Sequence, residues 1–223
     1  MGMILMVRHG QASWGAADYD ALSERGHEQA RVLGSTLAER GIVPTTVVHG
    51  GMRRHQETWE GIAEGAGWSL DAVVDQGWAE FDHVDVGALV PPPISESGGD
   101  LTPREVQRWV EASNHRWVGA GEDPAGDYVE SFGAFTRRVD DALARTPREG
   151  VVLVVTSGGP IAMAAAGLLS GEPQARADLW SRMHVVCANT GVTRLISGTR
   201  GLTLVTFNED THFDAAPTLR TYR

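Results

Sequence analysis

Met3-Ile4-Leu5-Met6-Val7-Arg8-His9-Gly10 is a short apolar run that ends in an arginine, a histidine and a glycine. A second run of this kind, Val151-Val152-Leu153-Val154-Val155, leads into Thr156-Ser157-Gly158-Gly159. Continuous apolar runs of this length are typical of strands buried on both faces of a parallel sheet that helices cover. Because ligands collect where such strands end, the two runs predict an α/β fold with a polar site after each of them.

Strand-like and helix-like patterns alternate through the rest of the chain. Weaker strands are expected at 45–49, 185–195 and 202–207, and apolar residues recur with helical spacing at 23–40, 53–65, 102–117, 132–144 and 160–169. This order predicts a three-layer α/β sandwich in which a mostly parallel central sheet is flanked by helices.

The length and composition suit one domain. The chain has 223 residues, of which 42% are hydrophobic, and no shift in composition marks a boundary, so we expect a single domain over residues 1–223. The segment from Pro91 to Pro103 is rich in proline, glycine and serine and predicts a loop. We place it within an excursion around residues 66–130 that lies near the site and shapes the choice of substrate.

The formal net charge of −10 argues against nucleic acid as a partner, because an acidic surface repels the phosphate backbone. A small anionic substrate remains compatible with this charge. A few arginines that converge locally bind such a substrate through short-range, charge-assisted hydrogen bonds.

The single cysteine, Cys187, stands in an apolar run and is expected to be a buried core thiol. The apolar start of the chain is too short for a signal segment, and no later run approaches membrane-spanning length. The sequence therefore predicts a cytoplasmic protein with no membrane partner. The oligomeric state is left open, with a homodimer as one option.

Arg8 and His9 together offer what phosphoryl transfer through a covalent intermediate requires. A neutral imidazole nitrogen can attack phosphorus, and a fixed guanidinium can balance the charge on the phosphoryl oxygens. Taken alone, so short a motif favours a surface turn that carries a solvated arginine. The blocks that follow favour the catalytic interpretation.

These blocks are Leu22-Ser23-Glu24-Arg25-Gly26-His27-Glu28-Gln29-Ala30, Gly50-Gly51-Met52-Arg53-Arg54-His55-Gln56-Glu57-Thr58, Trp78-Ala79-Glu80-Phe81-Asp82 and Asn189-Thr190-Gly191-Val192-Thr193. Together with Arg8-His9-Gly10-Gln11, and in this order, they resemble the histidine-phosphatase superfamily, which includes phosphoglycerate mutase and many small-molecule phosphatases. The resemblance spans nearly the whole chain.

The resemblance implies that His9 is the nucleophile and that Arg8 and Arg54 bind the phosphoryl oxygens. Gln11 and the backbone at Gly158 are further candidates for contacts with phosphate, the latter because the start of a helix attracts anions.

Glu80 aligns with the family's proton donor, which would protonate the leaving oxygen and later activate water. The family usually follows that glutamate with a glycine and a Trp-Glu-Gly segment, which Val86–Leu89 match only in part. Asp82 is therefore a rival for this role.

Ser157 stands where the family has its second histidine. A serine can donate a hydrogen bond to the phosphoryl group but cannot supply positive charge, so reduced turnover is expected. Two smaller departures are Gly50, where the family usually has a serine, and Gly15, where it often has an asparagine that touches phosphate.

Other histidines could replace the missing one in space. A solvated or structural role is the commoner fate of such residues, and the sequence places none of them in the pocket; they are His55, His83, His184 and His212.

The leading hypothesis is a phosphomonoesterase that uses neither metal nor cofactor and acts on a small phosphorylated metabolite through a phosphohistidine. The alternative is a phosphate-binding or regulatory protein with little turnover. A phosphoglycerate mutase-type phosphotransferase is disfavoured by the departures at residues 15 and 157. A serine hydrolase based on Ser157 would need a Gly-x-Ser-x-Gly turn, which the chain lacks.

Overall fold

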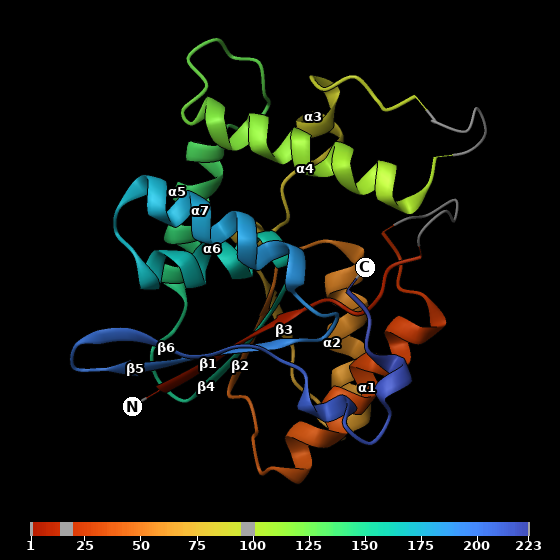
Figure 1. Ribbon diagram of the computed structural model, residues 1–223. Helices are drawn as coiled ribbons and strands as arrows, with labels where there is room; N and C mark the ends of the chain where they lie inside the picture. Colours follow the sequence, from red (N-terminus) through yellow and green to blue (C-terminus); the bar gives the residue numbers. More distant parts are fainter. Residues whose placement is uncertain (1, 14–19, 95–100, 223) are drawn as a thin grey trace. The chain divides into compact units, whose positions relative to one another are not determined.

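The structure is a computed structural model that describes residues 2–13, 20–94 and 101–222 (Figure 1). The chain forms two compact units, one of Met1–Glu80 with Val139–Arg223 and one of Phe81–Arg138. The expectation of a single domain stays a prediction.

A six-stranded sheet forms the centre of the first unit, in the order β3-β2-β4-β1-β5-β6. Three of its pairings are parallel and two, at β5, are antiparallel, which confirms the mostly parallel sheet. Its strands are β1 (Gly2–Arg8), β2 (Thr46–His49), β3 (Ala72–Val74), β4 (Val151–Thr156), β5 (Val192–Gly198) and β6 (Gly201–Glu209).

The register of the two central strands places the ends of both apolar runs side by side. Arg8 at the end of β1 pairs with Thr156 at the end of β4. His9 and Ser157 therefore leave the sheet at the same level and at the same edge. His9 N–H donates to the Thr156 carbonyl at 2.9 Å, which continues the ladder one residue beyond β1.

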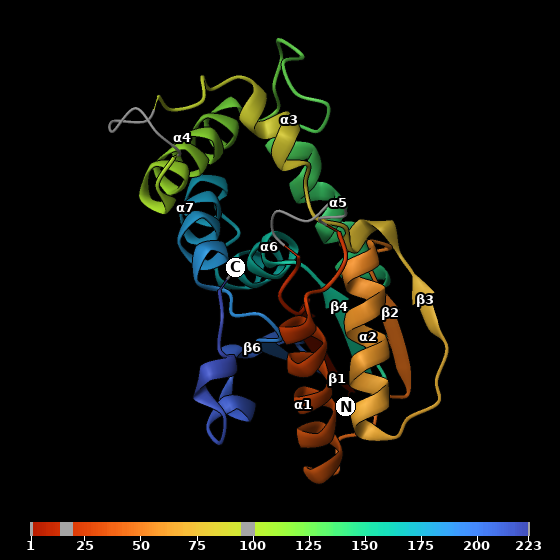
Figure 2. The same ribbon diagram turned by 90° about the vertical axis from the view of Figure 1, so that its right-hand side faces the viewer.

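The central strands bury side chains on both faces, as the apolar runs predicted. On one face, Leu5, Val7 and Leu153 belong to a core that includes residues of α1 (Glu24–Glu39) and α2 (Arg53–Ala66). The next residues along β1, Ile4 and Met6, point to the opposite face because side chains alternate along a strand. That face is covered by helix α6 (Gly158–Leu169), as Figure 2 shows.

The second unit contains α3 (His83–Ala88) and α4 (Pro103–Ala120). Its core is aromatic: the ring of Phe81 lies 4.7 Å from that of Trp117 and 5.6 Å from that of Phe135. These side chains therefore pack among themselves. Phe135 is in α5 (Phe132–Arg145), which begins in the second unit and ends in the first.

Three elements of the structure were not predicted from the sequence, and one predicted strand is partly wrong. Strand β3, helix α3 and helix α7 (Pro173–Met183) were not predicted. The strand expected at 185–195 is wrong in its first half, because His184–Val186 form a 3-10 turn and β5 begins at Val192. Of the loop expected at 91–103, residues 91–94 and 101–102 form neither helix nor strand, and 95–100 lie outside the described residues.

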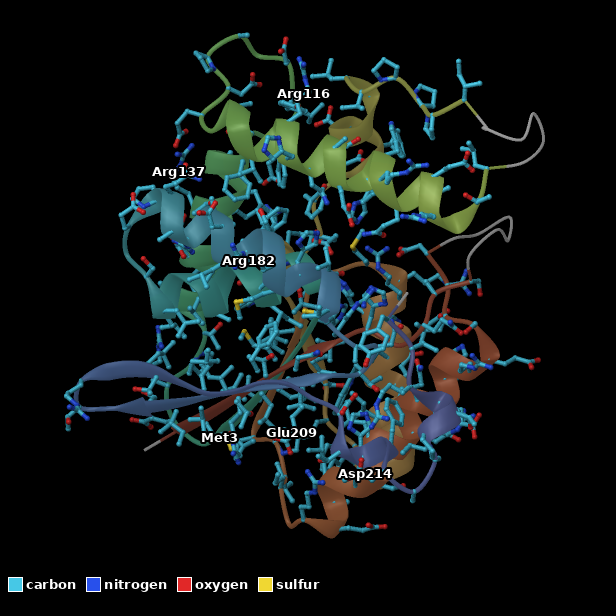
Figure 3. All side chains as sticks on the ribbon, viewed as in Figure 1. Met3, Arg116, Arg137, Arg182, Glu209 and Asp214 are labelled. Atoms are coloured by element: carbon cyan, nitrogen blue, oxygen red, sulfur yellow. The ribbon has the colours of Figure 1, made fainter. Side chains whose placement is uncertain are left out.

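The segment after β6 returns to the first helix. A 3-10 turn at Thr211–Phe213 follows β6, and Glu209 at the end of that strand pairs with Arg40, just after α1, at 3.4 Å. Figure 3 labels Glu209 and Asp214 in this region. The segment then continues through a second 3-10 turn, Pro217–Leu219, towards the edge of the sheet where His9 lies.

Candidate active site

The candidate site lies in the first unit, at the carboxyl ends of the parallel strands. His9 follows β1, Arg54 is in the first turn of α2 after β2, and Ser157 follows β4. Because these strands are parallel neighbours, residues that are more than 100 positions apart in the sequence meet at one edge.

The imidazole of His9 is buried and oriented by its neighbour. Its Nδ1 lies 2.7 Å from the carbonyl oxygen of Gly10, and since a carbonyl only accepts, Nδ1 carries the proton. Nε2 of the neutral ring then keeps its lone pair. The backbone is also fixed, because the Asn189 amide donates to the His9 carbonyl at 3.0 Å.

The surroundings keep His9 neutral. Burial lowers the pKa of His9 well below 6.5, and the positive charges of Arg54 and Arg8 lower it further. A histidine that is unprotonated at neutral pH retains the lone pair that a nucleophile needs.

Arg8 is held by backbone carbonyls. Its Nη1 donates to the carbonyl of Cys187 and, at 2.7 Å, to that of Tyr222. These contacts restrict the guanidinium before any ligand arrives. Cys187 itself is buried, and burial raises the pKa of its thiol to about 12, which confirms the expected core thiol.

Arg54 is the buried member of the Arg53–Arg54 pair. Its side chain is 7% exposed, and its Nη1 donates to Asp20 Oδ1 at 2.6 Å. Asp20 also accepts from the backbone N–H of Arg53 at 2.8 Å. The Asp20 carboxylate thus accepts hydrogen bonds from the Arg54 guanidinium and from the first turn of α2. A bound phosphoryl group would compete with Asp20 for these two donors.

The Glu80 side chain contacts the start of α6, whereas the Asp82 side chain caps helix α3. Glu80 Oε2 accepts from the Gly159 N–H at 3.2 Å. Asp82 caps α3 in the second unit by accepting from the N–H groups of Val84 and Asp85. The geometry therefore favours Glu80 over Asp82 as the carboxylate at the edge of the sheet, next to Gly158 and Ser157.

Ser157 has a partner that the sequence did not reveal. Its Oγ lies 2.7 Å from Nε2 of His55, a fully buried residue on α2. The ring of His55 lies 5.8 Å from that of His9. Of the histidines considered as substitutes, the structure brings this one to the site.

The remaining substitutes lie in other surroundings. His212 is buried against Thr190, with 2.9 Å between Nε2 and Oγ1. His184 stacks on Trp180, with 4.3 Å between ring centroids. His83 packs on Phe81 within the second unit. Gly15, the other position of interest, lies outside the described residues.

Two buried side chains tie the loop after β1 to its surroundings. Thr58 Oγ1 accepts from the Gly10 N–H at 2.9 Å and donates to the Arg54 carbonyl at 2.6 Å. Gln29 Oε1 accepts from the Gln11 N–H at 2.8 Å. The Gln11 backbone is therefore held in place close to His9.

Gln29 also holds the last described residues of the chain. Its Nε2 donates to the Leu219 carbonyl at 2.6 Å and to Thr221 Oγ1 at 2.8 Å. Thr221 in turn donates to Asn189 Oδ1 at 2.8 Å. We call residues 219–222 the C-terminal strap. Gln29 was not among the expected site residues, although a glutamine on the apolar face of a helix is a signal of buried hydrogen bonding.

The described residues contain neither a cluster of metal ligands nor a helix that could span a membrane. In residues 2–13, 20–94 and 101–222, no three side chains of histidine, cysteine, aspartate or glutamate cluster as metal ligands would. None of the helices in that part combines the length and the apolar character needed to cross a membrane.

Known proteins resemble this chain over most of its length. The model of the histidine phosphatase superfamily (branch 1) matches residues 4–210. A 2,3-bisphosphoglycerate-dependent phosphoglycerate mutase from Mesorhizobium japonicum is 26% identical over 197 residues, which cover 82% of this chain and 90% of that protein.

Two solved structures share the fold. A phosphoglycerate mutase from Bacillus anthracis matches 94% of each chain with a TM-score of 0.65 and 18% identity. A phosphoserine phosphatase mutant from Entamoeba histolytica, in complex with phosphoserine, matches 95% of this chain and 99% of its own with a TM-score of 0.63 and 19% identity. With a family model that spans the sheet and the site alike, this chain belongs to the histidine phosphatase superfamily.

Proposed function

We propose that this chain is a metal-independent phosphomonoesterase that forms a phosphohistidine on His9 and acts on a small phosphorylated metabolite. The observation that carries the proposal is the orientation of His9. Its Nδ1–H is fixed on the Gly10 carbonyl, which leaves the Nε2 lone pair for attack, while Arg8 and Arg54 supply positive charge beside it.

In the first step, His9 Nε2 attacks phosphorus, a P–N bond forms and the bond to the leaving oxygen breaks. Arg8 and Arg54 bind the phosphoryl oxygens, on which charge is spread in the transition state. Arg54 must first release Asp20. Glu80 gives a proton to the leaving oxygen, so that an alcohol departs.

In the second step, water attacks phosphorus and the P–N bond breaks. Glu80, now a carboxylate, takes a proton from this water, and inorganic phosphate leaves. Its fixed position at the Gly159 N–H keeps Glu80 at the edge of the sheet for both steps.

A phosphoglycerate mutase is the second candidate, because the curated relative from M. japonicum has that name. A mutase shares the first step but returns the phosphoryl group to a substrate oxygen instead of water. Ser157 in place of the second histidine favours the hydrolase, since a neutral residue there gives less support to a retained phosphoryl group.

The test compares the wild type with His9→Ala, and uses His115→Ala as the control because His115 is an exposed histidine of the second unit. Phosphate release is measured from an aryl phosphate and from a panel of metabolite phosphates, with and without a chelator. Isomerisation of phosphoglycerate is measured in parallel. Acid-labile incorporation of labelled phosphate reports the phosphohistidine.

We expect release in the wild type and in His115→Ala, no effect of chelator, and loss of both release and labelling in His9→Ala. Isomerisation that exceeds release would assign the mutase instead. Binding of phosphate ligands without turnover in any protein would assign a binding or regulatory role.

A further inference from the structure

The hydroxyl of Ser157 does not make the helix-capping hydrogen bond that its position predicts. Ser157 precedes α6 as its N-cap residue, where a serine usually accepts from a backbone N–H of the first turn. Within the described residues its side chain makes no such bond. It lies instead 2.7 Å from His55 Nε2.

His55 lies next to Arg54 in the sequence and next to His9 in space. His55 and Arg54 are consecutive residues in the first turn of α2, and both are buried. The ring of His55 is tilted by 37° relative to that of His9, at 5.8 Å between centroids. The pair His55–Ser157 therefore stands next to the nucleophile and the binding arginine.

The hydrogen bond between them has a direction. Nδ1 of His55 is buried and makes no hydrogen bond to any described residue. An unpaired buried N–H is rarer in proteins than an acceptor left without a donor, so the proton of a neutral His55 belongs on Nε2. Burial and the charge of Arg54 lower the pKa of His55 well below 6.5, which keeps the ring neutral.

With the proton on Nε2, His55 donates to Ser157 Oγ. The serine hydroxyl hydrogen is then left to be donated elsewhere, because a hydroxyl has one donor and accepts through its lone pairs. Its position at the carboxyl end of β4 faces the same edge of the sheet as His9.

We propose that His55 is a positioning residue that holds Ser157 so that its hydroxyl donates to the phosphoryl group at His9, and that this pair replaces the family's second histidine. The proposal rests on the proposed function. The pair supplies a hydrogen bond without a positive charge, and the charge then comes from the two arginines and the start of α6.

Gly50 lies against this pair. A Cβ at Gly50 would lie 2.3 Å from the Trp78 carbonyl oxygen and 2.7 Å from His55 Nδ1. The Trp78 backbone therefore excludes a side chain at residue 50, and the lack of one also leaves space for the His55 ring.

The kinetic test is a double-mutant cycle of His55→Leu and Ser157→Ala, with Ser157→Thr and His55→Gln as conservative controls that keep a donor. We expect Ser157→Ala to lower kcat about ten- to hundredfold with little change in KM, which is the range for a hydrogen bond to a charged group. His55→Leu should match it, and the double variant should lose no more than either single variant. The conservative controls should recover part of the rate.

The second test reads the tautomers in the wild-type protein. In wild-type protein labelled with ¹⁵N-histidine, NMR should show His55 as the neutral Nε2–H tautomer and His9 as the neutral Nδ1–H tautomer. Because the chain has eight histidines, the two signals are assigned by their loss in His55→Leu and in His9→Ala. This result does not depend on turnover.

Several results would overturn the proposal. These are a wild-type kcat in Ser157→Ala, losses in the two single variants that multiply in the double variant, or an Nδ1–H tautomer at His55. If wild-type turnover survives in His9→Ala, the proposed function itself fails. If turnover depends on His9 but not on His55 and Ser157, only this inference fails.

Discussion

Replacing Thr58 with valine should weaken both the fold and the site. Thr58 is fully buried, and valine keeps its branched shape while removing the hydroxyl. The Gly10 N–H, which donates to this hydroxyl at 2.9 Å, then loses its acceptor inside the protein. An unsatisfied buried donor destabilises a protein by about 1–3 kcal/mol, which corresponds to a decrease of about 2–12 °C in the melting temperature of a chain of this size.

The activity should fall for a related reason. The Gly10 carbonyl orients the His9 ring, so a displaced Gly10 peptide turns the nucleophile away from phosphorus. We expect kcat to decrease more than KM rises, because geometry matters most in the transition state.

Thr146→Val is the matched control. Thr146 is also buried, and its hydroxyl donates to a helix carbonyl four residues earlier, at Ala142, as that of Thr58 does at Arg54. Urea denaturation of both variants gives the comparison. If the unfolding free energies of Thr58→Val and Thr146→Val agree within about 0.5 kcal/mol and kcat is unchanged, the role given to the Gly10 hydrogen bond is wrong.

Three further predictions follow from charged and titratable groups. Asp20→Asn removes the carboxylate that pairs with Arg54 at 2.6 Å, so vanadate or phosphate should bind about three- to tenfold more tightly by calorimetry, and unchanged affinity would show that Asp20 does not compete. The lowered pKa of His9 should place the acidic decline of kcat/KM below pH 6.5, whereas a decline centred at pH 6.5 or above would contradict a desolvated nucleophile. Burial lowers the pKa of His212 to about 4. The unfolded chain therefore binds a proton at His212 between pH 6.5 and 4 that the folded chain does not. As the pH falls through this window, His212 alone should lower the unfolding free energy by up to about 3 kcal/mol, a contribution that His212→Gln should remove.

The central sheet was predictable because its strands are buried on both faces. The runs at 3–7 and 151–155 became β1 and β4, and the residues after them mark the site. Strand β3 was not predicted because it is a short edge strand, in which Val73 and Val74 are exposed. Helix α7 buries only Ala177 and Trp180 and shows little apolar periodicity, although Glu172 and Pro173 form a good helix start.

The error in the first half of the strand expected at 185–195 has a similar cause. Val185 and Val186 look like strand residues but are 43% and 48% exposed in a 3-10 turn. An apolar pair alone does not distinguish a strand from a turn between elements.

The candidate site residues could be proposed from the sequence only through local blocks. His9, Arg8 and Arg54 stand in contiguous motifs, and the structure brings them to one edge of the sheet. The pairing of His55 with Ser157 joins positions 102 residues apart, which no local pattern encodes. Asp20 and the C-terminal strap are likewise contacts that depend on the tertiary fold.

The position of β1 in the middle of the sheet has a consequence for how the molecule folds. β1 must find β4 about 150 residues later and β5 about 190 residues later, and closing such large loops is slow. His9 and Arg8 acquire their partners only after both pairings are made and the C-terminal strap has docked. Helices and local turns should therefore recover early during refolding, and the capacity to bind an anion should be among the last properties to return.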